Sequence, residues 1–199
     1  SPGQKARFQT ELDGIEVIRY ELEDGIRVEY RTPFGRVSNR FQTSSELRNK
    51  GVIALEVEHL IKSVEDYPPV EYILQHTCIK PCYDSYLSYE QELGEEGIPF
   101  VYIGQDPMNR ILQELIGYNQ AYFHLSDHPD RVEHLYQVLC EHYQQLQQVV
   151  LDSPAKLVMH GQHFDSTMTP LRIFHKYMTP YYQPFADKMH ARGKWLACH

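Results

Sequence analysis

The sequence lacks the features that would take a protein into a membrane or onto nucleic acid. It has no apolar run near the length that crosses a bilayer, and residues 1–5 do not lead into the apolar core of a signal peptide. Lys and Arg are not gathered into a stripe, and the formal net charge is −8, which argues against a nucleic-acid partner. We expect a cytoplasmic protein of soluble character, with small molecules or proteins as partners and no membrane partner.

Several catalytic and metal-binding motifs are also missing. There is no glycine-rich phosphate loop and no nucleophile elbow, which disfavours nucleotide enzymes and serine hydrolases. His76, Cys78 and Cys82 lack the Cys-x-x-Cys spacing of a zinc knuckle, so we interpret them as helix-end packing, because free cysteine usually behaves as a small buried hydrophobe. The four cysteines and eleven histidines fit a reducing compartment.

The N-terminal part of the chain predicts an antiparallel β meander. Residues 15–21 and 26–31 alternate in polarity around Glu23-Asp24-Gly25, which is a strong hairpin signal. A second turn at 32–35 leads into a third strand at 36–42. Residues 44–50 are interpreted as loop and 52–58 as a further strand. A capping box at 63–66 and Pro68-Pro69 predict a short helix that ends near Gln75.

The remaining chain alternates strands and helices, which is typical of a parallel α/β fold. We expect three strands, at 98–103, 156–161 and 194–199. We expect helices at 83–96, 106–116, 130–151 and 180–192, and a shorter helix between the second and third of these that ends at 125. Strands joined by helical crossovers run parallel. Three strands are too few to close a barrel, so either the sheet is open and small or the chain is part of something longer. We expect the second, because the sequence stops at the end of a strand with no covering helix.

Side chains just past the ends of these strands are the candidate site, because parallel sheets bind ligands at their carboxyl edge. His163 and Asp165 are the preferred catalytic pair, since a histidine beside a carboxylate suits proton transfer. The candidate substrate-binding residues are Tyr102, Gln105, His160 and Gln162. Two alternatives remain open: the cluster at 160–165 caps the following helix, and Asp106 is only a helix N-cap.

At this point the sequence resembles a known enzyme family. The resemblance lies in an ordered series of weak motifs over residues 25–199: LEVEHLIKSVEDY at 55–67, Thr169-Pro170, the aromatic helix with Pro180-Tyr181-Tyr182, HARGK at 190–194, and a strand that ends in histidine. Their order and spacing are similar to the uroporphyrinogen decarboxylase superfamily, and most similar to its methyltransferase-like branch, which is linked to corrinoid (cobalamin) cofactors.

The resemblance implies a (β/α)8 TIM barrel of which this chain holds the middle portion. Residues 1–199 would be a single domain, with the meander at 15–60 as an insertion and barrel β/α units at 68–199. It implies methyl transfer between a corrinoid cofactor and a zinc-activated thiol, with a corrinoid protein as partner and a homodimer as the assembly. The alternatives are a decarboxylase acting on a porphyrinogen, and a noncatalytic binding barrel fragment.

His199 is the candidate metal ligand. It ends a predicted strand, neutral imidazole is a common zinc ligand, and it matches the histidine of the His-x-Cys pair that the resemblance implies. The neighbouring Cys198 points to the other face of the strand, so the two residues do not both bind the metal. His124 and His128 have ligand spacing, but the helix breaks between them. We expect His134 and His142 to be solvated on the polar face of the long helix.

Overall fold

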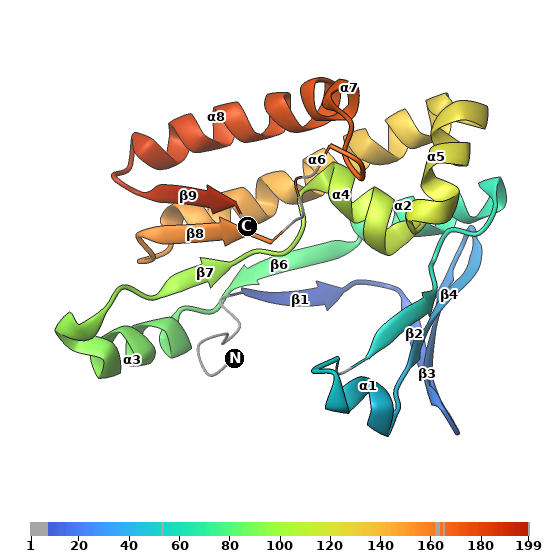
Figure 1. Cartoon of the computed structure of the whole chain (residues 1–199), viewed down its shortest axis with the longest axis horizontal. Coiled ribbons are helices and arrows are strands. Elements are labelled where there is room, and N and C mark those ends of the chain that lie inside the picture. The colour runs from blue at the N-terminus through green and yellow to red at the C-terminus, as the bar shows by residue number, and fades with distance from the viewer. Residues whose placement is uncertain (1–7, 53, 162–163, 165, 199) are drawn as a thin grey trace. The chain divides into compact units, whose positions relative to one another are not determined.

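A computed structural model describes residues 8–52, 54–161, 164 and 166–198 (Figure 1). The chain forms a mixed α/β structure with an antiparallel meander near its N-terminus. Its residues divide into two compact units. The first unit comprises the described residues within 1–11, 78–109 and 140–199, and the second comprises 12–77 and 110–139.

The second unit contains the predicted meander. Its strands are β2 (Glu16–Leu22), β3 (Gly25–Thr32), β4 (Gly35–Gln42) and β5 (Leu55–Glu58), in the order β2-β3-β4-β5 with antiparallel pairing throughout. Both predicted turns are confirmed, because Leu22 pairs with Gly25 and Thr32 pairs with Gly35. The meander therefore places alternate side chains of β3 and β4 on one face.

The segment predicted as a loop at 44–50 is helical, so that prediction is wrong. Helix α1 (Ser45–Asn49) begins after Ser44, whose side chain accepts a hydrogen bond from the backbone N–H of Leu47 at 3.0 Å. Lys50 Nζ lies 2.7 Å from Glu46 Oε1, one helical turn apart. A serine N-cap and an i,i+4 ion pair stabilise even a short helix, and neither was used in the sequence prediction.

The helices of the second unit follow the sequence prediction more closely. They are η1 (Val64–Asp66), α2 (Tyr67–Gln75), the π-helical turn η3 (Ile111–Leu115), α5 (Tyr118–Asp127) and the first part of α6 (Pro129–Asp152). Asp66 Oδ2 accepts a hydrogen bond from Ser63 N at 2.9 Å, as expected of the capping box. The buried stripe of α6 is also confirmed: Val132, Leu135, Leu139, Leu146 and Val150.

The first unit contains the predicted parallel sheet. Its strands are β7 (Phe100–Tyr102), β8 (Leu157–His160) and β9 (Trp195–Cys198), in the order β7-β8-β9. The other elements are β1 (Phe8–Leu12), β6 (Thr77–Pro81), α3 (Asp84–Leu93), η2 (Gly94–Glu96), α4 (Pro107–Arg110), the rest of α6, α7 (Leu171–Ile173), η4 (Phe174–Met178) and α8 (Thr179–His190). The pairing of β1 with β6 was not predicted. The described strands form no closed barrel.

The two faces of the parallel sheet differ in their exposure. Val101 and Val158 point to a face on which they are fully buried, and α8 runs alongside β9 (Figure 1). On the opposite face Leu157 of β8 lies between Phe100 of β7 and Trp195 of β9 in the strand register, and Trp195 is 67% exposed. Leu157 on this face is half-buried and Phe100 is 38% exposed, so the apolar face is only partly covered by the described residues, whereas parallel sheets are normally covered on both faces. Among those residues no helix has both the length and the apolarity that crossing a bilayer requires.

Candidate functional site

The candidate site is the loop at 104–106, which follows β7 in the first unit. Gly104 turns the chain with a positive φ of 75°, and its carbonyl accepts a hydrogen bond from Gly161 N at 3.1 Å. Ile103 N donates to Met159 O at 3.0 Å, so the backbone pairing of β7 with β8 continues up to the loop. The carboxyl ends of both strands therefore meet here, where parallel sheets carry their ligand sites.

Asp106 anchors the end of this loop. Its Oδ1 accepts from the backbone N–H of Asn109 at 3.0 Å, which confirms that it is the N-cap of α4. Its Oδ2 accepts from Asn109 Nδ2 at 2.7 Å and from the Tyr182 hydroxyl at 3.1 Å. The side chain is 1% exposed, and burial raises the pKa of its carboxyl group. Asp106 is therefore a helix cap and also one end of a buried hydrogen bond to α8.

His160 holds the start of the same loop from the end of β8. Its Nδ1 lies 3.0 Å from the Gly104 carbonyl oxygen and its Nε2 lies 3.0 Å from the Tyr181 hydroxyl. A carbonyl only accepts, so Nδ1 carries the proton and Nε2 accepts from Tyr181. The ring is fully buried, and that burial lowers the pKa of His160 to about 4. At neutral pH His160 is an uncharged positioning residue.

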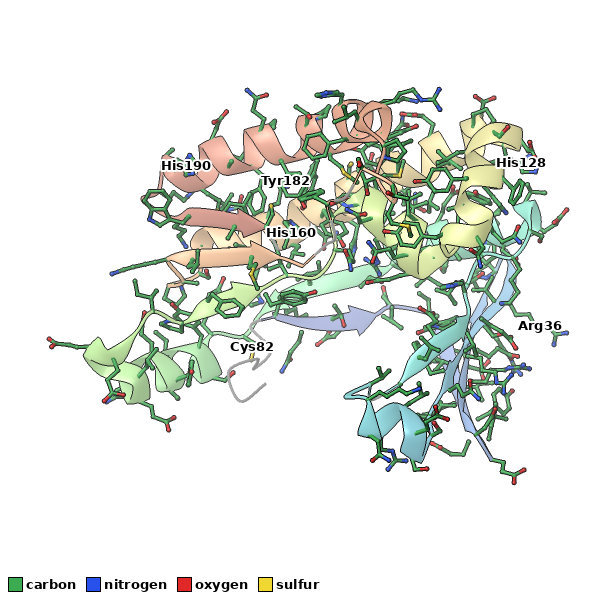
Figure 2. All side chains as sticks on the ribbon, viewed as in Figure 1. Arg36, Cys82, His128, His160, Tyr182 and His190 are labelled. Atoms are coloured by element: carbon green, nitrogen blue, oxygen red, sulfur yellow. The ribbon has the colours of Figure 1, made fainter. Side chains whose placement is uncertain are left out.

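The tyrosines around His160 complete the support of the loop. Tyr143 donates its hydroxyl proton to the carbonyl oxygen of Gln105 at 2.7 Å. Consecutive residues of α8, Tyr181 and Tyr182, reach His160 and Asp106, and Figure 2 shows Tyr182 and His160 beside each other. Burial raises the pKa of both hydroxyls, with the Asp106 carboxylate adding to the effect at Tyr182. The hydroxyls of Tyr181 and Tyr182 are therefore neutral donors at physiological pH.

The structure brings four of the sequence-predicted residues to this edge of the sheet. They are Tyr102, Gln105, Asp106 and His160. Tyr102 is partly exposed and donates weakly to the Gly161 carbonyl oxygen at 3.4 Å, while the Gln105 side chain is half-buried. Gln162, His163, Asp165 and His199 lie outside the described residues.

Gly161 leaves room for the Tyr102 ring beside the chain. A Cβ at position 161 would lie 2.1 Å from atoms of that ring, closer than real Cβ contacts. The glycine therefore allows an aromatic side chain to cover the backbone at the end of β8. Among the substrate-binding candidates, Tyr102 and Gln105 are the two described residues with accessible surface at this edge.

Sequence reasoning missed four residues of the site: Asn109, Tyr143, Tyr181 and Tyr182 in their hydrogen-bonding roles. A buried inward position for Tyr181, Phe185 and Met189 was expected from the helical pattern and is confirmed. The available signal was the pair Tyr181-Tyr182 after Pro180, because tyrosines on a buried helix face need hydroxyl partners. Periodicity does not reveal which partners they find.

No group of three or more His, Cys, Asp or Glu side chains within the described ranges could hold a metal ion. Cys78 is exposed, which corrects the expectation that it packs as a buried hydrophobe. His142 is buried rather than solvated, whereas His134 is exposed with its Nδ1 2.8 Å from Glu71 Oε1. His124 Nδ1 forms a 2.9 Å hydrogen bond with the Tyr67 hydroxyl, so His124 has a structural partner.

Comparison with protein-family models, with curated proteins and with solved structures finds no match for this chain. Functional interpretation therefore depends on the strand-end geometry and on the motifs of the sequence.

Proposed function

We propose that the chain is the middle portion of a cytoplasmic (β/α)8-barrel enzyme of the uroporphyrinogen decarboxylase type. Two structural features support this proposal. The polar loop at 104–106 lies at the carboxyl end of a parallel strand, where barrel enzymes place their substrate sites. The partly exposed apolar face with Phe100 and Trp195 is what one strand segment of a barrel would present to the interior, which layers of side chains fill.

The observation that carries the proposal is the pair of hydrogen bonds from α8 to the strand ends. Tyr181 binds His160 and Tyr182 binds Asp106, which fixes both ends of the loop that carries Gln105. A substrate site requires polar groups held in place before the ligand arrives. We assign small-molecule binding to Tyr102, Gln105 and Gln162, with His160 as positioning residue. The proposal keeps His163 and Asp165 as the catalytic pair.

The proposed reaction is methyl transfer between a corrinoid cofactor, carried by a partner protein, and a zinc-activated thiol. A bound zinc ion would lower the pKa of that thiol. The proposal assigns the metal to His199 and to residues that the structure does not describe, because the described residues do not fit a zinc site. No step of the reaction is therefore derived through the metal. The described residues bind and orient: the neutral His160 and the tyrosines exclude water behind the loop. A homodimer is part of the same proposal.

A second candidate is decarboxylation of a porphyrinogen, for which the same loop would bind the substrate. Loss of CO2 leaves an electron pair on carbon that must take up a proton. Asp106 is 1% exposed and accepts three hydrogen bonds within the first unit, so in this candidate it holds the loop in place and does not deliver that proton. A barrel that binds ligand without catalysis is the remaining interpretation.

The test incubates the protein with methylcobalamin and a small thiol and follows the corrin absorbance, beside a parallel reaction in which CO2 release from uroporphyrinogen is measured. Methyl transfer is expected, and Gln105→Ala should slow it by about tenfold because one binding hydrogen bond is lost. The matched control is Gln148→Ala on the exposed face of α6, which should keep the wild-type rate. CO2 release without methyl transfer would favour the decarboxylase. If neither methyl transfer nor CO2 release is detected, both proposed activities are overturned.

A further inference from the structure

The second unit contains a pocket, lined by both apolar and charged side chains, that none of the candidate site residues lines. Its volume is about 340 Å³, and it lies between the inner face of the meander and the segment of Arg110 and η3. That volume is within the range of small-molecule sites. The lining residues are Tyr30, Asn39, Phe41, Glu56, Leu60, Arg110, Glu114 and Leu115.

Asn39 offers this pocket an unused hydrogen-bond acceptor. The residue is 8% exposed, and its Nδ2 donates to Glu56 Oε1 at 2.8 Å. Because a carboxylate only accepts, this bond fixes which end of the amide is the nitrogen. The other end, Oδ1, is buried and has no hydrogen-bond partner among the described residues. A buried acceptor without a partner is costly, so its position favours a ligand that brings a donor.

The charges around the pocket also favour a donor that carries positive charge. Burial raises the pKa of Glu114, Arg110 opposes this effect, and the nearby Glu56 adds to it, so the two carboxylates are close enough to interact. Arg110 is the only guanidinium of the lining, and its Nε lies 3.5 Å from Glu114 Oε2. His59 Nδ1 lies 3.7 Å from Glu56 Oε2 but 2.9 Å from the Glu114 carbonyl oxygen, to which it donates. One guanidinium therefore faces two carboxylates.

The aromatic side chains of the pocket lining favour an organic cation over a metal ion. Tyr30 and Phe41 lie on β3 and β4, on the same face of the meander as Asn39. Rings accommodate hydrocarbon and attract a cation over their faces. A metal ion would require a set of ligands, and no group of three or more His, Cys, Asp or Glu side chains that could hold one is present in the described part of this unit.

We propose that this pocket binds the primary ammonium group of a small organic molecule. A primary ammonium has three N–H donors, which matches Asn39 Oδ1 and the carboxylates of Glu56 and Glu114. The carbon chain of the ligand lies against Tyr30 and Phe41. The π-helical turn η3 brings Glu114 to the pocket, and such turns often occur at functional sites.

The test titrates the protein with n-butylammonium chloride at pH 7.5 and follows backbone amide resonances. Saturable shifts confined to the lining residues are expected, with a Kd of about 1 mM for so small a probe. Tetramethylammonium has the same charge but no N–H donor, and should bind at least about tenfold more weakly. n-Butanol, which lacks the charge, should give no saturable shift.

Two variants and a matched control identify the acceptors. Glu114→Gln and Asn39→Leu should each weaken n-butylammonium binding by about tenfold, because each removes one acceptor. Glu46→Gln in α1 changes a glutamate of the same unit outside the pocket and should leave the Kd within about twofold. If Asn39→Leu does not fold, Glu114→Gln decides. Unchanged binding in Glu114→Gln, equal affinity for tetramethylammonium, or shifts outside the pocket would overturn the proposal.

Discussion

At the scale of the residue, the candidate site shows how much of a ligand site consists of groups that do not meet the ligand. Asp106 accepts three hydrogen bonds and His160 uses both ring nitrogens within the first unit. Both side chains are buried, and the loop at 104–106 that they hold carries Gln105. Burial acts on the two groups in opposite ways: it raises the pKa of Asp106 and lowers the pKa of His160.

The hydrogen bond from Tyr182 to Asp106 should contribute measurably to stability. Tyr182→Phe removes one of the three donors to a buried carboxylate, and a hydrogen bond to a charged group is worth about 2 kcal/mol. We expect the free energy of unfolding to fall by that amount in a urea titration. Trp195, the chain's only tryptophan, reports on the first unit by fluorescence.

The matched control for Tyr182→Phe is Tyr89→Phe in α3. Tyr89 is half-buried in the same unit, and no hydrogen bond of its hydroxyl is recorded among the described residues. Its loss of stability should stay below about 0.5 kcal/mol. Equal losses in the two variants would mean that the Asp106 bond contributes nothing beyond ordinary packing of the ring.

At the scale of the element, polarity patterns predicted the meander and the parallel order β7-β8-β9, since both depend on local alternation and on short turns. The strand ends were predicted too, which located Gln105, Asp106 and His160. The bonds from Tyr143, Tyr181 and Tyr182 were not, because they join segments that lie far apart in the sequence.

Two further kinds of element escaped the sequence prediction for physical reasons. The π-helical turns η3 and η4 lie in stretches that have ordinary helical composition, and only packing decides the wider turn. Strand β6 occupies 77–81, whereas the sequence predicts that Cys78 packs at the end of a helix. A short strand with lysine and proline has little alternation, so its pairing with β1 depends on tertiary contacts.

The pairing of β3 with β4 should depend on Gly25 more than on Gly35. Both glycines have positive φ, 155° and 131°, but a Cβ at Gly25 would lie 1.9 Å from the carbonyl oxygen of Phe41, whereas one at Gly35 would meet nothing within 4 Å. We expect Gly35→Ala to cost about 1 kcal/mol and Gly25→Ala at least about 3 kcal/mol. Hydrogen exchange of the β3 and β4 amides measures both, and similar losses would contradict the clash.

At the scale of the whole molecule, the two compact units carry different kinds of polar interior. The first has neutral donors around one carboxyl group and one uncharged imidazole. The second has paired carboxylates around an amide acceptor. Since protonation acts on these groups differently, the stability of the chain as a function of pH should reveal which buried group dominates in the first unit.

His160 should make the first unit less stable as the pH falls from about 6.5 to about 4. The unfolded chain binds a proton at the ordinary histidine pKa of 6.5, whereas the folded state resists it until the lowered pKa of about 4. Between those values the unfolded state holds more protons, so stability rises with pH, by about 3 kcal/mol across the window. Asp106 has the opposite effect on stability: because its pKa is raised, the folded state takes up this proton before the unfolded state does as the pH falls toward 3.8. This uptake makes the loss of stability less steep at the low-pH end. Urea titrations at several pH values, read by Trp195 fluorescence, measure the decline, and the NMR resonances of the His160 ring locate its pKa directly. A ring that titrates near 6.5, or a His160→Gln variant with an unchanged acid decline, would show that this histidine is protonated freely in the folded chain.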